Sequence, residues 1–192
     1  FSDDQSAIRE LAHQIFSDRA TDEFLLAFSR SDATYDDPLW QTLAEQGLLG
    51  IAVPEAAGGS GLGLIELCLV LEEQGRHVAP VPLLASLVLG GLPIAHFGSA
   101  EQQQHYLAPM AAGELKLSAI AEAGMNAALV SRVSAKREGN GWVLSGSRAV
   151  IPDGAVADYI LVPATDDSHA ETFFIVPTTA PGVTLTPVEI GL

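Results

Sequence analysis

The spacing of apolar positions in the first part of the chain is that of amphipathic helices. From Asp3 to about Arg19, apolar residues recur every three or four positions, namely at Ile8, Leu11, Ala12, Ile15 and Phe16. A second helix is expected to begin at Asp37-Pro38, because proline suits a first helical turn, and to end at Gly47, because glycine suits a helix terminus. The glycine-rich segment 47–63 is then predicted to be a loop.

Three further helical segments are predicted before residue 113. Residues 62–74 are largely apolar and precede Gly75, which is expected to end a buried helix. Residues 78–95 carry no charge, but three prolines and a Gly-Gly pair interrupt them, so we predict a short buried helix broken at Gly90-Gly91 and not a membrane span. Ser99 and Gln102 have the spacing of a capping box, and the helix that they begin is expected to stop at Gly113.

After Gly113 the pattern changes to the two-residue alternation of strands. Apolar and polar residues alternate from Val130 to Ala135, and Gly139-Asn140-Gly141 offers a tight turn into another apolar run, which predicts a hairpin. Further short apolar runs, separated by turn residues, lie at 159–162, 173–176 and 183–185.

These patterns divide the chain of 192 residues into two parts. We predict an N-terminal all-α domain over residues 1–113 and a small β-barrel or β-sandwich domain over residues 114–192, so that the fold class is α+β. Apolar residues make up 48% of the chain, which is enough to give both parts a core and argues against disorder.

Charge and cysteine content exclude several classes of protein. Nine Lys and Arg against 24 Asp and Glu give a net charge of −15, which repels nucleic acid phosphates and anionic membrane surfaces. We therefore expect no nucleic acid and no membrane partner. The single cysteine, Cys68, excludes an intrachain disulfide, and the first residues lack the profile of a signal peptide, so a cytoplasmic location is expected.

General catalytic motifs are absent from the sequence. It contains no glycine-rich nucleotide loop and no nucleophile elbow. The five histidines, at positions 13, 77, 96, 105 and 169, lack the spacing of metal ligands, so no metal site is expected. Arg76 and His77 are expected to complement the dipole at a helix end, which is a structural role, and the alternative is recognition of an acyl or CoA group.

Several segments, in their order along the chain, resemble the acyl-CoA dehydrogenases. Pro38-Leu39-Trp40 and the loop at 47–63 are similar to the second helix and following loop of that family. The sequence GSAEQQQHYLAPMAAGE at 98–114 is close to a family signature. Gly146-Ser147-Arg148 and the run 157–162 resemble elements that bracket a flavin-contact strand in the family. The likeness covers essentially the whole chain.

This resemblance implies FAD as the cofactor, an acyl-CoA as the substrate and a homo- or hetero-oligomeric assembly. In the family's reaction a carboxylate removes the α proton of an acyl thioester while the β hydrogen leaves as hydride to the flavin. Family members normally end in a C-terminal helical bundle that carries the catalytic Glu. That bundle is missing from this chain, so we assign no catalytic residue, and we expect the acyl-chain pocket along residues 80–97.

The resemblance places the cofactor-binding residues in two segments of the β domain, Ser118, Ile120 and Ala121 in the first and Val150, Ile151 and Pro152 in the second. Ala127 falls where the family has a serine that contacts CoA, and it is assigned to substrate binding. Ala121 replaces a threonine, Val150 an aromatic ring, and Pro152 a residue with a hydroxyl group. The expected flavin contacts are therefore depleted. Glu122 matches the family pattern, but its expected role is that of a structural carboxylate.

Three functions stay open from the sequence. The first is an acyl-CoA dehydrogenase subunit that helps to hold FAD and an acyl-CoA. The second is a non-catalytic partner subunit with a decayed flavin pocket, an arrangement similar to heteromeric actinobacterial dehydrogenases that act on bulky steroid-type thioesters. The third is an acyl-CoA oxidase or a flavin monooxygenase on the same scaffold.

Overall fold

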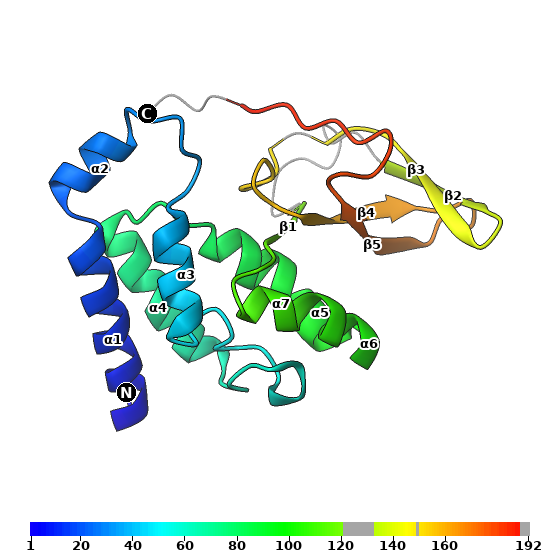
Figure 1. Ribbon diagram of the computed structural model, residues 1–192. Helices are drawn as coiled ribbons and strands as arrows, with labels where there is room; N and C mark the ends of the chain where they lie inside the picture. The colour runs from blue at the N-terminus through cyan, green and yellow to red at the C-terminus, as the bar shows by residue number, and fades with distance from the viewer. Residues whose placement is uncertain (121–132, 149, 189–192) are drawn as a thin grey trace. The chain divides into compact units, whose positions relative to one another are not determined.

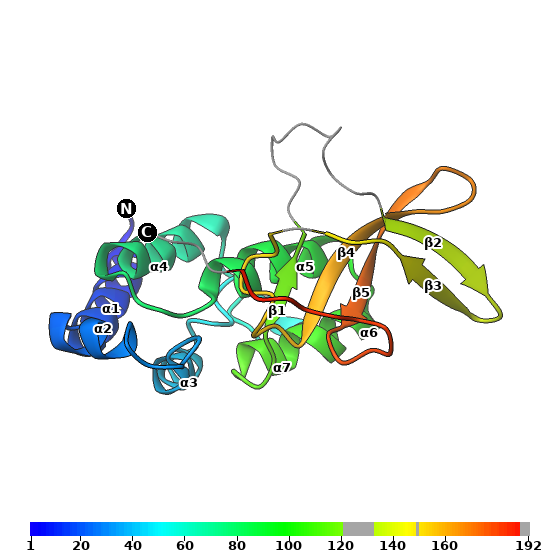
Figure 2. The ribbon, with the colours of Figure 1, turned by 90° about the horizontal axis from the view of Figure 1, so that it is seen from above.

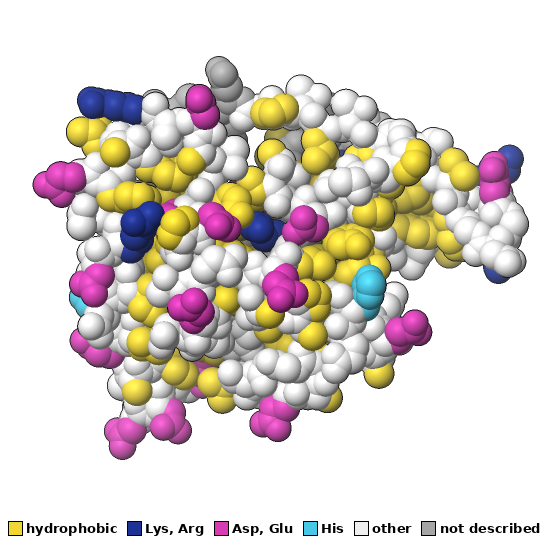
Figure 3. All heavy atoms as spheres, viewed as in Figure 1, with side chains coloured by type: hydrophobic (Ala, Val, Ile, Leu, Met, Phe, Trp, Pro, Cys, Tyr) yellow, Lys and Arg dark blue, Asp and Glu magenta, His cyan; other side chains and the backbone are white. Residues whose placement is uncertain are grey.

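The computed structural model of the chain describes residues 1–120, 133–148 and 150–188. The chain divides into two compact units, Phe1–Lys116 and Leu117–Leu192. Helices build the first unit and strands build the second, which confirms the α+β prediction (Figure 1). Acidic side chains outnumber Lys and Arg on the face of the molecule seen in Figure 3, in keeping with the net charge of −15.

The helical unit begins with α1 (Asp3–Arg19), α2 (Asp22–Phe28) and α3 (Asp37–Glu45). Helices α1 and α3 confirm the prediction, and Gly47 takes a positive φ of 74° just after α3, as a helix terminator does. Helix α2 was not predicted. Its 7 residues make only two turns, which is too short for apolar periodicity to be visible.

After a loop that contains the 3₁₀ helix η1 (Glu55–Ala57), α4 runs over Leu64–His77. The predicted end at Gly75 was wrong, because the helix continues through that glycine and stops at Val78, which has a φ of 52°. Contacts made by Glu73 and His77 with α1 hold this last turn. Helices α1 and α4 lie side by side (Figures 1 and 2).

The uncharged stretch after α4 forms the π-helix η2 (Leu84–Gly91) and α5 (Leu92–Phe97). The predicted break at Gly90-Gly91 was wrong, because the helical path continues through both glycines. Gly91 serves packing instead, since a Cβ there would stand 3.1 Å from both the Met110 Cε and the Ser86 carbonyl oxygen. Within the described ranges, no helix has both the length and the apolar character needed to cross a membrane.

The last helical segment consists of α6 (Ala100–Gln102), the π-helix η3 (Gln103–Leu107) and α7 (Ala108–Ala111). Ser99 and Gln102 form the predicted capping box, and Gly113 ends the segment with a φ of 78°, as predicted. The core of the unit includes the fully buried side chains of Phe16, Trp40, Leu43, Leu67 and Leu107.

The second unit contains a mixed sheet of five described strands, β1 (Leu117–Ala119), β2 (Val133–Glu138), β3 (Gly141–Ser145), β4 (Tyr159–Thr165) and β5 (Glu171–Pro177). Strand β4 pairs antiparallel with β5 along its whole length. It pairs parallel with β1 near its start and with β2 near its end, so β1 and β2 share its other edge. Strands β2 and β3 form the predicted hairpin around Gly139-Asn140.

Three parts of the β pattern differ from expectation. Residues 183–185 form no strand, and Leu185 instead packs on a core cluster of the sheet unit. The segment expected to be a flavin-contact strand forms no strand in the described residues from 146 to 158, where residues 152–156 are turns. Strand β1 was not predicted, because three residues are too few to show an alternation. Val130 lies outside the described residues.

Candidate functional site

A hydrogen bond joins the two segments that were assigned to cofactor binding. Ser118, the middle residue of β1, is completely buried, and its Oγ donates to the Pro152 carbonyl oxygen at 2.5 Å. The two residues are 34 positions apart in the sequence. Because β1 pairs in parallel with β4, this hydrogen bond fastens the turn at 152–156 to the edge of the sheet.

The two isoleucines of the assigned set are core residues. Ile120 is 7% exposed and forms a cluster with Ala157 and Ile160, against which Ile151 packs. The Ile120 backbone N–H donates to the Leu161 carbonyl oxygen at 3.1 Å, which continues the pairing of β1 with β4. The side chains of Ile120 and Ile151 therefore pack into the core of the sheet unit and anchor the two assigned segments there.

Val150 differs from the other described members of the set because its side chain is 65% exposed. Its φ of 58° is in the left-handed region, which β-branched residues rarely adopt. The turn that follows is closed by a hydrogen bond from the Gly154 N–H to the Ile151 carbonyl oxygen at 3.1 Å. Val150 thus presents an apolar side chain on a strained backbone, at the position where the resemblance called for an aromatic ring.

These residues fit a flavin ring incompletely. Ser118 uses its hydroxyl hydrogen inside the protein, and Ile120, Val150, Ile151 and Pro152 have no side-chain donor. Pro152 also lacks a backbone N–H. The assigned positions that the structure describes therefore leave only backbone groups to donate hydrogen bonds to a flavin. Ala121, Glu122 and Ala127 lie outside the described residues.

The helical unit contains an apolar pocket. It is lined by side chains from the loop after α3, from α4 and from the helices that follow, including Leu49, Ile51, Leu67, Leu87, Gly91 and Met110. Leu87 and Gly91 belong to the stretch 80–97 in which the acyl-chain pocket was expected, whereas Met110 comes from α7. The pocket is apolar, since its lining residues carry no charged side chain. Sequence reasoning missed the contribution of α7, because nothing in the local pattern of Met110 indicates its contact with Gly91.

Family comparisons match both units in order along the chain. Residues 2–114 match the family model described as acyl-CoA dehydrogenase, N-terminal domain. Residues 119–192 match the model described as acyl-CoA dehydrogenase, middle domain. The chain spans less than half the length of the first curated relatives that it matches, 43% and 42%.

Several solved structures share the fold of this chain. The "Tcur3481-Tcur3483 steroid ACAD G363A variant" is 44% identical, with a TM-score of 0.83 over 93% of this chain and 49% of that one. The ChsE4-ChsE5 complex from Mycobacterium tuberculosis is 33% identical, with a TM-score of 0.87 over 98% of this chain and 50% of that one. An acyl-CoA dehydrogenase complexed with FAD, from Bacillus anthracis, is 30% identical, with a TM-score of 0.84 over 99% of this chain and 33% of that one.

The ordered match of both domain models agrees with the motifs at 47–63 and 98–114 and with the helix-then-sheet architecture. Together the two models account for nearly every residue of the chain. The chain therefore belongs to the acyl-CoA dehydrogenase family, of which it carries the N-terminal and middle domains.

Proposed function

We propose that this chain is part of a flavin-dependent acyl-CoA dehydrogenase, which removes the α and β hydrogens of an acyl-CoA thioester and passes a hydride to FAD. The observation that carries the proposal is the ordered match of both family domains over residues 2–114 and 119–192. The FAD complex of the Bacillus anthracis relative, with its TM-score of 0.84, supports the choice of cofactor. The chain performs this reaction as part of a homo- or hetero-oligomeric assembly.

In this proposal each unit has a distinct task. The acyl chain binds along the helical unit, where the apolar residues Leu87, Gly91 and Met110 lie together. The segment held by the Ser118–Pro152 hydrogen bond faces the flavin through backbone groups. The carboxylate that removes the α proton is supplied from outside residues 1–192, because the family resemblance places it in the C-terminal bundle.

The test is an anaerobic titration of the purified full-length protein, in its native assembly, with acyl-CoA thioesters of several sizes. Bleaching of the oxidised flavin spectrum, with transfer of electrons to an artificial acceptor, is the expected result. A steroid-type thioester belongs in the set because one relative is called a steroid ACAD. An assembly without flavin that reduces no acceptor with any thioester would refute the proposal. Oxygen consumption with release of peroxide would indicate an oxidase instead.

The second candidate is a partner subunit that holds no flavin of its own and completes the site of a related chain. The partner role is favoured by the exposed Val150, by Pro152, which has no donor, and by the Ser118 hydroxyl, which is bonded within the protein. Each hydrogen bond to a charged group typically contributes about 1.5–3 kcal/mol, so the lack of these donors weakens the binding of an anionic flavin. The complex formed by ChsE4 and ChsE5 gives a precedent for two different chains in one assembly.

Flavin content distinguishes the two candidates. The chain is expressed alone and together with a related acyl-CoA dehydrogenase chain from the same organism, and the flavin bound per chain is measured after gel filtration. One flavin per chain and activity of the chain alone would refute the partner role. Flavin and activity that appear only after co-expression, with about one flavin for every two chains, would support it.

A further inference from the structure

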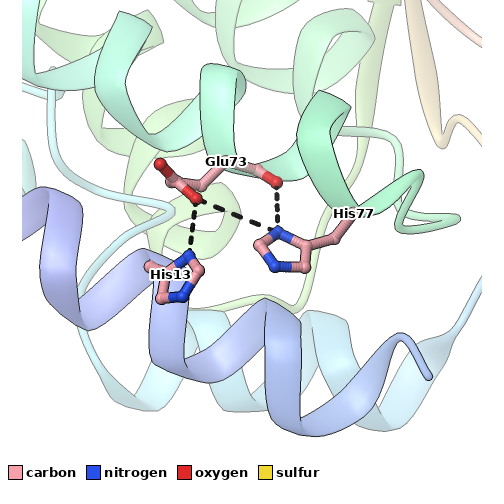
Figure 4. A group of neighbouring side chains, drawn as sticks. All are labelled: His13, Glu73 and His77. Carbon is pink, nitrogen blue, oxygen red and sulfur yellow. Dashed lines mark hydrogen bonds and ion pairs between the residues drawn. The ribbon is translucent and has the colours of Figure 1, made fainter.

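Three side chains of the types that bind metal ions converge between α1 and α4. His13 projects from α1, and Glu73 and His77 project from α4, where their spacing of four residues puts them on one helix face (Figure 4). One nitrogen or oxygen atom from each lies within 4.8 Å of the others. His13 and Glu73 are 60 positions apart, so the spacing of histidines in the sequence could not reveal the group.

The centre of the group is the Glu73 carboxylate, whose side chain is only 3% exposed. Its Oε2 lies 3.0 Å from His13 Nδ1 and 3.9 Å from His77 Nδ1. A carboxylate at this depth is costly unless it is paired with positive charge, because it has lost most of its hydration. The groups that face Oε2 are imidazoles, which supply positive charge only when they are protonated or when they share a metal ion with the carboxylate.

Arg76 compensates Glu73 only in part. Its Nε lies 3.6 Å from the other carboxylate oxygen, Oε1, while its Nη2 makes a closer contact of 2.7 Å with Glu72. With both imidazoles neutral, the charges of Arg76, Glu72 and Glu73 sum to about −1. A divalent cation at Oε2 therefore meets a locally negative environment, on a chain whose net charge of −15 also attracts cations.

We propose that His13, Glu73 and His77 bind a divalent transition-metal ion, for which zinc is the best match. Two imidazole nitrogens and one carboxylate oxygen form a ligand set that zinc uses, with a fourth position left for water. Calcium and magnesium are disfavoured because they require oxygen ligands. Tetrahedral zinc places its ligand atoms about 3.4 Å apart, so small side-chain rotations must close the present separation of up to 4.8 Å.

The packing of the two helices prepares these ligands. The His77 Nδ1 lies 2.9 Å from the Glu73 carbonyl oxygen, and this hydrogen bond holds the ring beside the Glu73 carboxylate. Binding of an ion through Nδ1 requires that this hydrogen bond be given up. The Phe16 ring stacks on His77, with centroids 6.4 Å apart, and further limits its rotation. A bound ion would join α1 directly to α4 and stabilise the start of the helical unit.

The test uses the full-length protein after removal of metal with a chelator. Zinc is titrated in competition with a chromophoric chelator, and the unfolding temperature is measured with and without zinc. The variants His13→Gln and His77→Gln remove one ligand each. The matched control is His105→Gln, which replaces an exposed histidine of η3 outside the group. We expect one zinc ion per chain, binding at least tenfold weaker in both cluster variants, and unchanged binding in the control.

Zinc is further expected to raise the unfolding temperature of the unaltered protein and of the control, but not of the cluster variants. The absorption spectrum of the cobalt-loaded unaltered protein gives a readout that does not depend on the folding of any variant, since a tetrahedral site produces intense visible bands. Failure of the unaltered protein to bind zinc stoichiometrically would overturn the proposal. Equal zinc affinity in the unaltered protein and both cluster variants would also overturn it, because the ion would then bind elsewhere.

Discussion

Buried polar side chains in the helical unit have partners from distant parts of the chain. Asp36 is 3% exposed, and it receives hydrogen bonds from Arg19 Nε at 2.6 Å and Nη2 at 2.8 Å. The same carboxylate caps α3 by accepting the Leu39 N–H at 3.4 Å. Hydrogen bonding to Asp36 raises the pKa of the Arg19 guanidinium, which remains charged throughout the usual pH range. One ion pair thus connects the end of α1 with the start of α3.

Removal of the Arg19 charge should destabilise the helical unit. Arg19→Met keeps the aliphatic part of the side chain but leaves the buried Asp36 carboxylate without its guanidinium. We expect a loss of about 2–3 kcal/mol in the free energy of unfolding, below the 3–5 kcal/mol typical of fully buried pairs, because Arg19 is 41% exposed and water can reach the site. Urea denaturation followed by circular dichroism measures this loss.

Two comparisons make this prediction specific. Arg9→Met removes an exposed arginine of α1 and should change stability by no more than about 0.5 kcal/mol. Adding Asp36→Asn to Arg19→Met should recover part of the loss, since the amide can still cap α3 without a buried charge. A double variant that is less stable than Arg19→Met would contradict the explanation.

At the scale of helices, the end of an element depended more on packing than on its own residues. Gly75 and Gly91 are both helix breakers in the sequence, but α4 and the η2–α5 segment run through them. Gly75 is exposed, with no other heavy atom within 4 Å of where a Cβ would be. Gly91 is buried against Met110. Both glycines lie within helical backbone, but only Gly91 is required by the packing around it.

Substitution of these glycines by alanine should change stability in opposite directions. Gly75→Ala should raise the free energy of unfolding by about 0.5–1 kcal/mol, because alanine is the better helix former and meets open space. Gly91→Ala should lower it by about 1–3 kcal/mol, because its Cβ would stand 3.1 Å from a backbone oxygen that cannot move freely. Thermal unfolding of both variants measures the difference, and a stabilising Gly91→Ala would contradict the packing that we describe.

A second contact between α1 and α4 makes stability depend on pH. The Glu66 carboxylate accepts a hydrogen bond from the Gln5 side chain at 2.9 Å and another from the Gly63 N–H at 3.0 Å. The hydrogen bond from Gln5 is the main cause that lowers the pKa of Glu66 from its ordinary value of 4.5. A lowered pKa means that the folded state favours the charged form. The stabilisation is therefore present above pH 4.5 and is lost as the pH falls through the folded-state pKa.

The variant Glu66→Gln should reveal this dependence. It should unfold at a lower temperature than the unaltered protein at pH 7, and the gap should narrow as the pH falls below 4.5. Glu10→Gln is the control, because the Glu10 side chain is exposed on α1 and makes no hydrogen bond to the described residues, and it should not show a gap that closes in this way. Scanning calorimetry across the acid range gives the comparison, and a gap for Glu66→Gln that widens at low pH would show that the sign is wrong.

For the whole molecule, the proposed function depends on how its two units divide the binding of an acyl-CoA and a flavin. The apolar pocket is in the helical unit and the assigned flavin segments are in the sheet unit. The family match covers both units, but the side chains at the described positions assigned to flavin binding leave no free hydrogen-bond donor, since Ser118 donates within the protein. Substitution of Val150 and Pro152 by the residue types of the family should therefore change the amount of flavin retained, while the fold stays the same.

We predict that Val150→Trp combined with Pro152→Thr increases the flavin retained per chain. A new hydrogen bond worth about 1.5–3 kcal/mol corresponds to roughly tenfold to a hundredfold tighter binding. Tryptophan is not β-branched, so it suits the φ of 58° at residue 150 no worse than valine does. Flavin absorbance after gel filtration is the measurement. Val143→Trp, at a half-exposed position of β3, is the control, and equal flavin retention in all three proteins would refute the role of the two positions.

The sequence by itself determined the local elements and the family. Periodic apolar positions predicted α1, the serine–glutamine spacing predicted the capping box at Ser99, and the glycine turn at 139–141 predicted the β2–β3 hairpin. These predictions succeed because backbone preferences, capping and alternation act over a few neighbouring residues. The ordered motifs at 47–63 and 98–114 likewise identified the family, because they keep recognisable residues in one continuous stretch.

Only the tertiary structure decided what distant residues do together. In the tertiary structure α4 continues through Gly75, and Gly91 packs against Met110. Ser118 forms a hydrogen bond with Pro152, and His13 lies next to Glu73 and His77. None of these contacts leaves a local pattern, because close packing and side-chain pairing depend on which elements meet in space. The candidate flavin segments could thus be chosen from the sequence. Only the fold shows that the Ser118 hydroxyl donates within the protein, and this hydrogen bond limits what those segments can bind.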